Sequence, residues 1–306
     1  MSETLKNEPC GVLVVNKHKG VTSHDIVNKI RRLYGTKRVG HTGTLDPLAT
    51  GVLVVLVGRA AKASEYLVCD SKKYRATLRL GLTSDSEDIT GNILSQSDNI
   101  PNFEAVQTAC AEFVGNIKQI PPMYSALKMD GKKLVDLARE GKTVERQARD
   151  ITVFSMNVAP TEVNTDYTLD VHCSSGTYIR TLCADIGARL GCGGVMAELE
   201  RREAGGFSIE KSVTVDELET MSDSERQALL APIEELFSSL PEVRIEAFYE
   251  KLSRNGCEIY QKKIKTDFPV GERVRMATKS GRFYALGEVR EYEEGSAIKA
   301  IKLFEL

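Results

Sequence analysis

The stretch from residue 40 to residue 57 constrains the fold of this sequence more than any other. Val52–Val57 is an unbroken apolar run rich in β-branched residues, which is typical of a strand buried on both faces. The segment before it, Gly40–Gly51, contains glycines that permit tight turns and close approach of a ligand to the backbone. Because Pro47 restricts Asp46 to extended conformations, this carboxylate is predicted to sit in one pose at the mouth of a core strand. The pose suits a nucleophile, although a turn-forming Asp-Pro pair explains the same pattern.

Helix and strand signals alternate along the rest of the chain. Thr22 and Asp25 form a capping-box pattern before a helix that reaches Leu33. Tyr74–Leu80 alternates apolar and polar residues like a half-buried strand, and Thr177–Leu190 has the periodicity of a helix. We predict a loop over residues 83–99, and further helices up to about residue 239. The sequence therefore predicts an α+β fold.

The character of the sequence changes near Leu240-Pro241. Short predicted strands at 273–277, 282–289 and 297–306 are separated by glycine, proline and asparagine, as in a small all-β unit. We therefore expect two domains in the 306 residues, 1–240 and 241–306.

Charge and cysteine content narrow the function classes. The net charge is −2, but residues 1–80 carry +8 and residues 81–306 carry −10, an asymmetry that hints at nucleic-acid contact and also fits a solvated basic face. The seven cysteines include no C-x-x-C pair, so a zinc site or disulfide framework is not expected. The cysteine usage indicates a reducing cytoplasm, and no run is long and apolar enough for a membrane span. Phosphate-loop and dinucleotide motifs are absent, so we expect chemistry by side chains without a cofactor or metal.

Two further side chains are candidates for chemistry. Tyr74 lies among Lys72, Lys73 and Arg75, and cations that stabilise a phenolate would make it a base; a core tyrosine at a strand start fits the same pattern. Arg180 is placed in the first turn of a helix, where its charge opposes the helix dipole. That placement favours a specific partner such as a carboxylate, although an ordinary surface arginine would fit equally well.

Several motifs occur in an order that resembles one family, the TruB family of bacterial tRNA pseudouridine-55 synthases. The segments are Lys17–Ser23, Gly40–Leu53, Lys73–Arg75, Pro121–Lys128, Gly176–Arg180 and Phe283–Val289. The resemblance extends from about residue 11 to the C-terminus. It implies a pseudouridine-synthase fold with a mixed, largely antiparallel central sheet and a small C-terminal β-barrel-like (PUA-like) RNA-binding domain. It also implies an RNA-contacting insertion at about 121–150.

The resemblance also implies roles for individual residues. Asp46 matches the nucleophile of the family, Arg180 the arginine paired with it, and Tyr74 the residue that stacks on the target base and is a candidate for removing the C5 proton. Further matches are to residues that hold or surround the uridine: His41, Tyr178 and Leu199. Lys17 is predicted to bind substrate, and it belongs to a set of candidate phosphate contacts with Lys19, Arg31, Arg32, Lys37 and Arg38.

The implied reaction is isomerisation of the T-loop uridine of tRNA, at position 55, without a cofactor, by a monomer whose partner is the T arm. The target base must leave its stack, which costs a few kcal/mol. Whether aspartate attacks the sugar or the base, or a glycal forms, stays open. Two alternatives also stay open: a tRNA-binding or tRNA-folding module with secondary or no catalysis, and a carboxylate-nucleophile hydrolase, which usually needs two carboxylates. The sequence departs from the family at His18, where proline is usual, and at Glu200, which makes the alignment of Leu199 uncertain.

Overall fold

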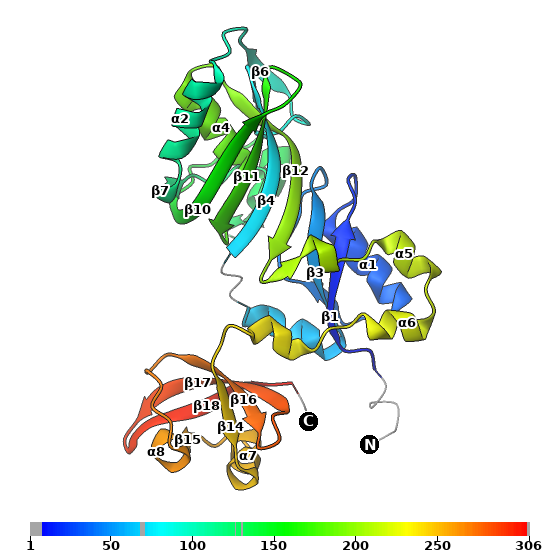
Figure 1. Cartoon of the computed structure of the whole chain (residues 1–306), viewed down its shortest axis with the longest axis vertical. Coiled ribbons are helices and arrows are strands. Elements are labelled where there is room, and N and C mark those ends of the chain that lie inside the picture. Colours follow the sequence, from blue (N-terminus) through cyan, green and yellow to red (C-terminus); the bar gives the residue numbers. More distant parts are fainter. Residues whose placement is uncertain (1–7, 68–70, 126, 130, 305–306) are drawn as a thin grey trace.

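A nine-stranded sheet lies at the centre of the larger part of the molecule (Figure 1). The computed structural model describes residues 8–67, 71–125, 127–129 and 131–304, so residue 126 of the Pro121–Lys128 motif and the last two residues of the final predicted strand lie outside the described residues. The strands of the central sheet are β1 Gly11–Lys17, β2 Val39–His41, β3 Thr50–Val57, β4 Ser71–Leu80, β7 Gly115–Gln119, β10 Arg149–Pro160, β11 Asp166–Ser174, β12 Gly194–Ala204 and β13 Phe207–Ser208.

The order of this sheet is β1-β3-β12-β4-β11-β10-β7, with β2 added beside β3 and β13 beside β12. Among the described residues of this sheet, only β3 and β12 pair in parallel, and the other pairs are antiparallel. The predicted mixed, largely antiparallel sheet is confirmed. Because β12 lies between β3 and β4, a late segment of the chain joins two early ones.

Helices pack against the sheet and contribute residues to its hydrophobic cores. They are α1 Ser23–Leu33, α2 Phe103–Glu112, α3 Leu134–Arg139, α4 Ile179–Leu190, α5 Val215–Thr220, α6 Asp223–Ala228 and the 3₁₀ helices η2 Gly58–Glu65, η3 Ile209–Lys211 and η4 Ile233–Phe237. The predicted capping box is confirmed: Thr22 accepts a hydrogen bond from the backbone N–H of Asp25, and the Asp25 carboxylate accepts one from the backbone N–H of Thr22. The segment that follows β3 directly is the 3₁₀ helix η2.

The β3 run is apolar on both faces because each face meets a separate core. Leu53, Val55 and Val57 pack in the large core with α1, α2 and α4, whereas Val52, Val54 and Leu56 pack in a second core. The second core also contains Phe237, Phe283 and Phe304, whose rings contact one another. It therefore joins the central sheet to the C-terminal part of the chain.

A five-stranded sheet forms the C-terminal part, at one end of the molecule (Figure 1). Its elements are β14 Glu242–Ile245, α7 Ala247–Arg254, β15 Ile259–Tyr260, α8 Gln261–Ile264, β16 Arg273–Thr278, β17 Phe283–Tyr292 and β18 Gly295–Leu303. The three predicted strands are present as β16, β17 and β18. The prediction of an all-β unit is wrong, because α7 and α8 are helical. Ser253 is the one buried residue of α7. The mixture of charged and apolar residues in this segment therefore resembles that of a surface loop, and its sequence does not predict a helix.

Two other sequence predictions are wrong. The predicted loop over 83–99 contains a short hairpin, β5 Leu82–Ser84 with β6 Ile93–Gln96. Residues 194–204, which fall in the region predicted as helices, form the eleven-residue strand β12. Alanine, methionine, leucine, glutamate and arginine favour helices intrinsically, but pairing with β3 and β4 on both sides overrides that preference here. Helices η3, α5, α6 and η4 follow β12, within the region predicted to be helical up to about residue 239. Within the described residues, no helix has the length and apolar character needed to cross a membrane.

Gly187 lies where α4 packs closely against the first residue of β12. A Cβ atom at this position would lie 2.1 Å from the backbone nitrogen of Gly194, which cannot move as a side chain could. We expect Gly187→Ala to lower the free energy of unfolding by about 1–3 kcal/mol, the usual cost of overpacking. Thermal unfolding measures the effect. Gly40→Ala is the control, because its Cβ would meet nothing within 4 Å; equal melting temperatures for the two variants would contradict the packing argument.

Candidate active site

Asp46 lies on the loop between β2 and β3, and this loop is anchored to the first turn of α1. The buried Ser23 hydroxyl donates to the backbone oxygen of Leu45 at 3.0 Å and accepts from its backbone nitrogen at 2.8 Å. After Asp46, the Pro47 oxygen accepts a hydrogen bond from Gly20 N–H at 2.8 Å. The loop is therefore held on both sides of the carboxylate, and the Asp46 side chain stays 39% exposed.

Arg180 is the cation nearest to this carboxylate. Its Nε lies 3.0 Å from Asp46 Oδ2, and its side chain is 6% exposed. Its Nη atoms donate to the backbone oxygens of Ser86 at 3.2 Å and Tyr124 at 2.8 Å, and Nη1 lies 3.8 Å from Asp88 Oδ2. The guanidinium is thus fixed in place before any substrate binds. The structure supplies the carboxylate partner that an arginine in the first turn of a helix was expected to need.

A cavity of about 240 Å³ opens between these two residues and Tyr74. Five of the predicted site residues line it: Asp46, Tyr74, Tyr178, Arg180 and Leu199. The backbone of Tyr178 is held by the Gln119 side-chain amide, which donates to its oxygen at 3.0 Å and accepts from its nitrogen at 2.8 Å. Residues from a loop, two strands and a helix start therefore face one small space that holds a carboxylate, a phenol and a guanidinium.

The sequence argument for a tyrosinate at Tyr74 is wrong. Burial raises the pKa of Tyr74, so at neutral pH it is a phenol. Strand alternation turns Lys73 and Arg75 to the other face, where they pair with Glu203 at 2.9 Å and Asp170 at 2.8 Å. The cation that does act on Tyr74 is Arg201, its partner across the sheet, whose charge only partly offsets the effect of burial on the pKa of Tyr74.

Lys17 and His41 do not line the cavity. Lys17 is fully buried, and its ammonium donates to the backbone oxygens of His18, Val21 and Pro47 at 3.0, 2.9 and 3.4 Å. Burial lowers its pKa to about 8. The predicted contact of Lys17 with substrate or phosphate is therefore wrong for this structure, in which Lys17 braces the Asp46 loop. His41 is partly buried at the end of β2, and burial lowers its pKa, which favours the neutral imidazole.

Arg201 is a residue of this site that sequence reasoning missed. The only signal was the arginine doublet at 201 and 202, and nothing local separates the two. Strand alternation in β12 separates them, since Arg201 is 1% exposed while the Arg202 side chain is 37% exposed. Because β12 was predicted as helix, that alternation could not be used.

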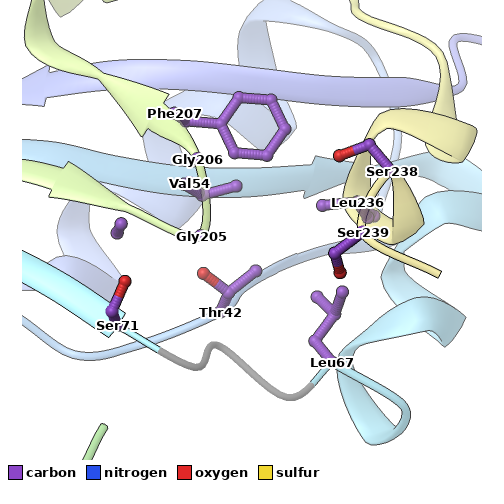
Figure 2. Close-up of a pocket in the computed structure, with 11 residues that line it drawn as sticks. Thr42, Val54, Leu67, Ser71, Gly205, Gly206, Phe207, Leu236, Ser238 and Ser239 are labelled. Atoms are coloured by element: carbon purple, nitrogen blue, oxygen red, sulfur yellow. The ribbon is translucent and has the colours of Figure 1, made fainter. Parts of the chain in front are cut away.

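Another cavity, of about 200 Å³, lies between Thr42, Phe207 and the segment that carries Ser238 (Figure 2). Thr42 and Ser71 face it from one side, Leu236, Ser238 and Ser239 from the other, and the Phe207 ring covers it. Among the described residues that line it, none carries a charged side chain. Nor does the described part of the chain contain a group of three or more His, Cys, Asp or Glu residues that could hold a metal.

Comparison with known proteins places this site in a family. Residues 31–179 match the model of the TruB family pseudouridylate synthase N-terminal domain, and residues 180–238 match that of the tRNA pseudouridylate synthase B C-terminal domain. A tRNA pseudouridine synthase B from Alkaliphilus oremlandii is 40% identical over 97% of this chain and 98% of that protein. The Neisseria meningitidis protein of the same name is 39% identical over 96% of this chain and 94% of its own length.

Solved structures agree with the fold. A chain in the crystal structure of a Cbf5-Nop10-Gar1 complex aligns with a TM-score of 0.75 at 26% identity, over 99% of this chain and 88% of that one. A chain of an H/ACA RNP bound to a substrate RNA containing 2′-deoxyuridine aligns with a TM-score of 0.74 at 24% identity, over 100% of this chain and 88% of that chain. The alignments span both sheets, so the architecture of the whole chain is shared with these structures.

Proposed function

The chain belongs to the TruB family of pseudouridylate synthases, and on that premise we propose that it isomerises the uridine at position 55 in the T loop of tRNA, with Asp46 as nucleophile. The observation that carries the assignment of the site is the Asp46–Arg180 ion pair at 3.0 Å in a cavity that Tyr74 also lines. The loop is held on both sides of Asp46, and the buried guanidinium of Arg180 binds this side chain in one orientation.

The chemistry follows from these groups. The uridine leaves its stack and enters the cavity, where the Tyr74 ring stacks on the base and Tyr178 and Leu199 enclose it. Asp46 attacks the uridine, the N-glycosidic bond breaks, the uracil turns, a bond forms from C1′ to C5, and the Asp46 carboxylate is released. The C5 proton must then leave while N1 gains one, so the product is an isomer of the substrate. Because Tyr74 is a phenol, it takes up the C5 proton only as it passes its own proton on, and the Asp46 carboxylate in the same cavity is a suitable acceptor.

The experiment that tests this function is incubation of the protein with an unmodified tRNA transcript, followed by mapping of pseudouridine. We expect one site, the T-loop uridine at position 55, and no product from a transcript with cytidine there. Tight binding without product would instead favour a tRNA-binding or tRNA-folding module. Product elsewhere in the tRNA would contradict the proposed position.

The organisation of the chain is part of the proposal. We assign catalysis to residues 1–240, with an RNA-contacting insertion at 121–150, and RNA binding to residues 241–306; the separate sheet that begins at Glu242 supports the division. A tRNA substrate and the free thiols of the six described cysteines support the cytoplasm as location. We propose a monomer, and sedimentation at micromolar concentration would reveal a stable dimer.

The basic residues beside the site are expected to contact RNA phosphates. Arg32 and Lys37 are exposed at the end of α1 and after it, whereas Arg31 bonds to Asn28 and Val39 within the fold. Replacing both Arg32 and Lys37 with alanine should reduce the slope of log affinity against log salt by about 0.7–0.9 for each phosphate that the variant no longer neutralises. Filter binding at several salt concentrations measures the slope. Arg189→Ala, at the far end of α4, is the control; the same slope in all three proteins would remove Arg32 and Lys37 from the interface.

A further inference from the structure

Arg201 is the largest fully buried side chain of the described residues, and it lies beside the candidate site without lining its cavity. In the sheet, Arg201 pairs with Gly51 of β3 on one side and with Tyr74 of β4 on the other. The strands approach so closely that a Cβ at Gly51 would lie 2.3 Å from the Arg201 oxygen. Arg201 therefore stands between the loop that carries Asp46 and the strand that carries Tyr74.

The guanidinium of Arg201 is bound to the backbone of the Asp46 loop at three points. Nη2 donates to the Gly43 oxygen at 3.0 Å, Nη1 to the Thr44 oxygen at 3.3 Å, and Nε to the Val52 oxygen at 2.7 Å. These carbonyls lie on both sides of Asp46 in the sequence. One planar side chain thus joins the start of the loop to the start of the strand that follows it, a geometry that a lysine cannot reproduce.

The charge of Arg201 is compensated by dipoles instead of a carboxylate. Among the residues that the structure describes, no Asp or Glu lies within ion-pair distance of it. The charge of Arg201 acts on the groups around the site. Its contribution lowers the pKa values of Lys17, His41 and Tyr74, although burial raises the pKa of Tyr74 overall. Burying a cation without a counter-ion costs free energy, which the three carbonyl hydrogen bonds must offset. The burial of Arg201 and the position of the Asp46 loop therefore depend on each other.

We propose that Arg201 is a positioning residue for the isomerisation, which holds the Asp46 carboxylate and the Tyr74 hydroxyl in one arrangement around the uridine. It acts through the carbonyls of Gly43, Thr44 and Val52 and through its position beside Tyr74 in the sheet, and it does not line the cavity. This inference rests on the proposed function, because it assigns a role within that same site.

The first test is Arg201→Lys, with Arg202→Lys as the matched control. Arg202 is the next residue of the same strand, is partly exposed, and lies 3.9 Å and 3.7 Å from Glu200 and Glu210. We expect Arg201→Lys to lower kcat by about 10²-fold, the cost of a small misplacement of reacting groups, with KM for tRNA within about threefold of wild type. Arg202→Lys should leave both constants within about threefold.

The second test is chemical rescue, which a purely structural role would not produce. Arg201→Ala leaves a guanidinium-shaped space lined by three carbonyl oxygens. Guanidinium chloride, at concentrations that leave the wild-type protein folded, should raise kcat of this variant at least about tenfold. Potassium chloride at equal ionic strength should not. Arg202→Ala should show no rescue.

The outcomes separate the inference from the function on which it rests. If the wild-type protein makes no pseudouridine, the proposed function fails. If the wild type is active but Arg201→Lys keeps its kcat, or loses affinity for tRNA instead, the positioning role is rejected. The positioning role is also rejected if guanidinium gives no rescue of Arg201→Ala. It is rejected as well if neither Arg201 variant folds, because the sheet itself would then require Arg201.

Discussion

Asp46→Asn is expected to lower kcat for pseudouridine formation by at least about 10³-fold, because an amide is a far weaker nucleophile than a carboxylate. The substitution keeps the size and shape of the side chain. Its amide oxygen can still accept from Arg180 Nε, which lies 3.0 Å away in the wild type. Single-turnover reactions with a tRNA transcript measure the effect.

Binding distinguishes a catalytic role of Asp46 from a structural one. The loop is held by Ser23, Lys17 and Arg201 through its backbone, so its position does not depend on the Asp46 side chain. We therefore expect tRNA affinity within a few-fold of wild type. Asp98→Asn, on an exposed loop, is the control and should be fully active. A melting temperature or affinity that falls together with kcat would assign Asp46 to the fold.

Local patterns predicted the elements whose signals do not depend on the rest of the chain. The Thr22–Asp25 capping box, the apolar run of β3 and the alternation of β4 all depend on neighbours in sequence, and all are present. Strand β12 was missed because its residues favour a helix, and only its position between β3 and β4 makes it extended. The burial of Arg201 depends on the same strand pairing, so neighbouring residues in the sequence do not predict it.

The site was located by resemblance more than by residue physics. Motif order identified Asp46, Tyr74 and Arg180 as one set, and these three residues do line one cavity. Electrostatic reasoning from neighbours in sequence failed at Tyr74, because Lys73 and Arg75 pair with acids on the other face and only Lys72 shares the cavity. It also failed at Lys17, whose ammonium is buried. A lysine in a basic segment resembles a phosphate contact, and only the tertiary structure shows that its donors are already used by carbonyls.

Arg180→Met is expected to abolish most activity and to destabilise the protein. The guanidinium is buried against Asp46 and Asp88, and its charge also acts on Glu87. Methionine has a similar length but leaves these carboxylates without their cation. Removing one partner of a buried pair costs about 3–5 kcal/mol, and we expect the lower end because Asp46 is still partly exposed. We expect kcat to fall by at least about 10²-fold, since the carboxylate loses its orientation.

The loss of stability in Arg180→Met should depend on pH in one direction. Burial raises the pKa of Glu87 above 4.5 in the wild type, although Arg180 opposes that shift, so the variant should have a still higher value. A carboxyl with a raised pKa in the folded state binds its proton more tightly there than in the unfolded chain. The unfolding free energy of the variant should therefore increase, relative to wild type, as the pH falls from neutral toward 4.5.

Melting temperatures at neutral and mildly acidic pH, compared with those of Arg189→Met, decide between these expectations. Arg189 lies on the same helix and pairs with Glu112 at 2.7 Å, but its side chain is 58% exposed. An exposed pair is worth about 0–1 kcal/mol, so the control should unfold almost like wild type and remain active. If Arg180→Met loses as much stability at low pH as at neutral pH, its defect lies in packing and not in unpaired carboxylates. If it keeps its turnover, the ion pair with Asp46 is not part of the catalytic arrangement.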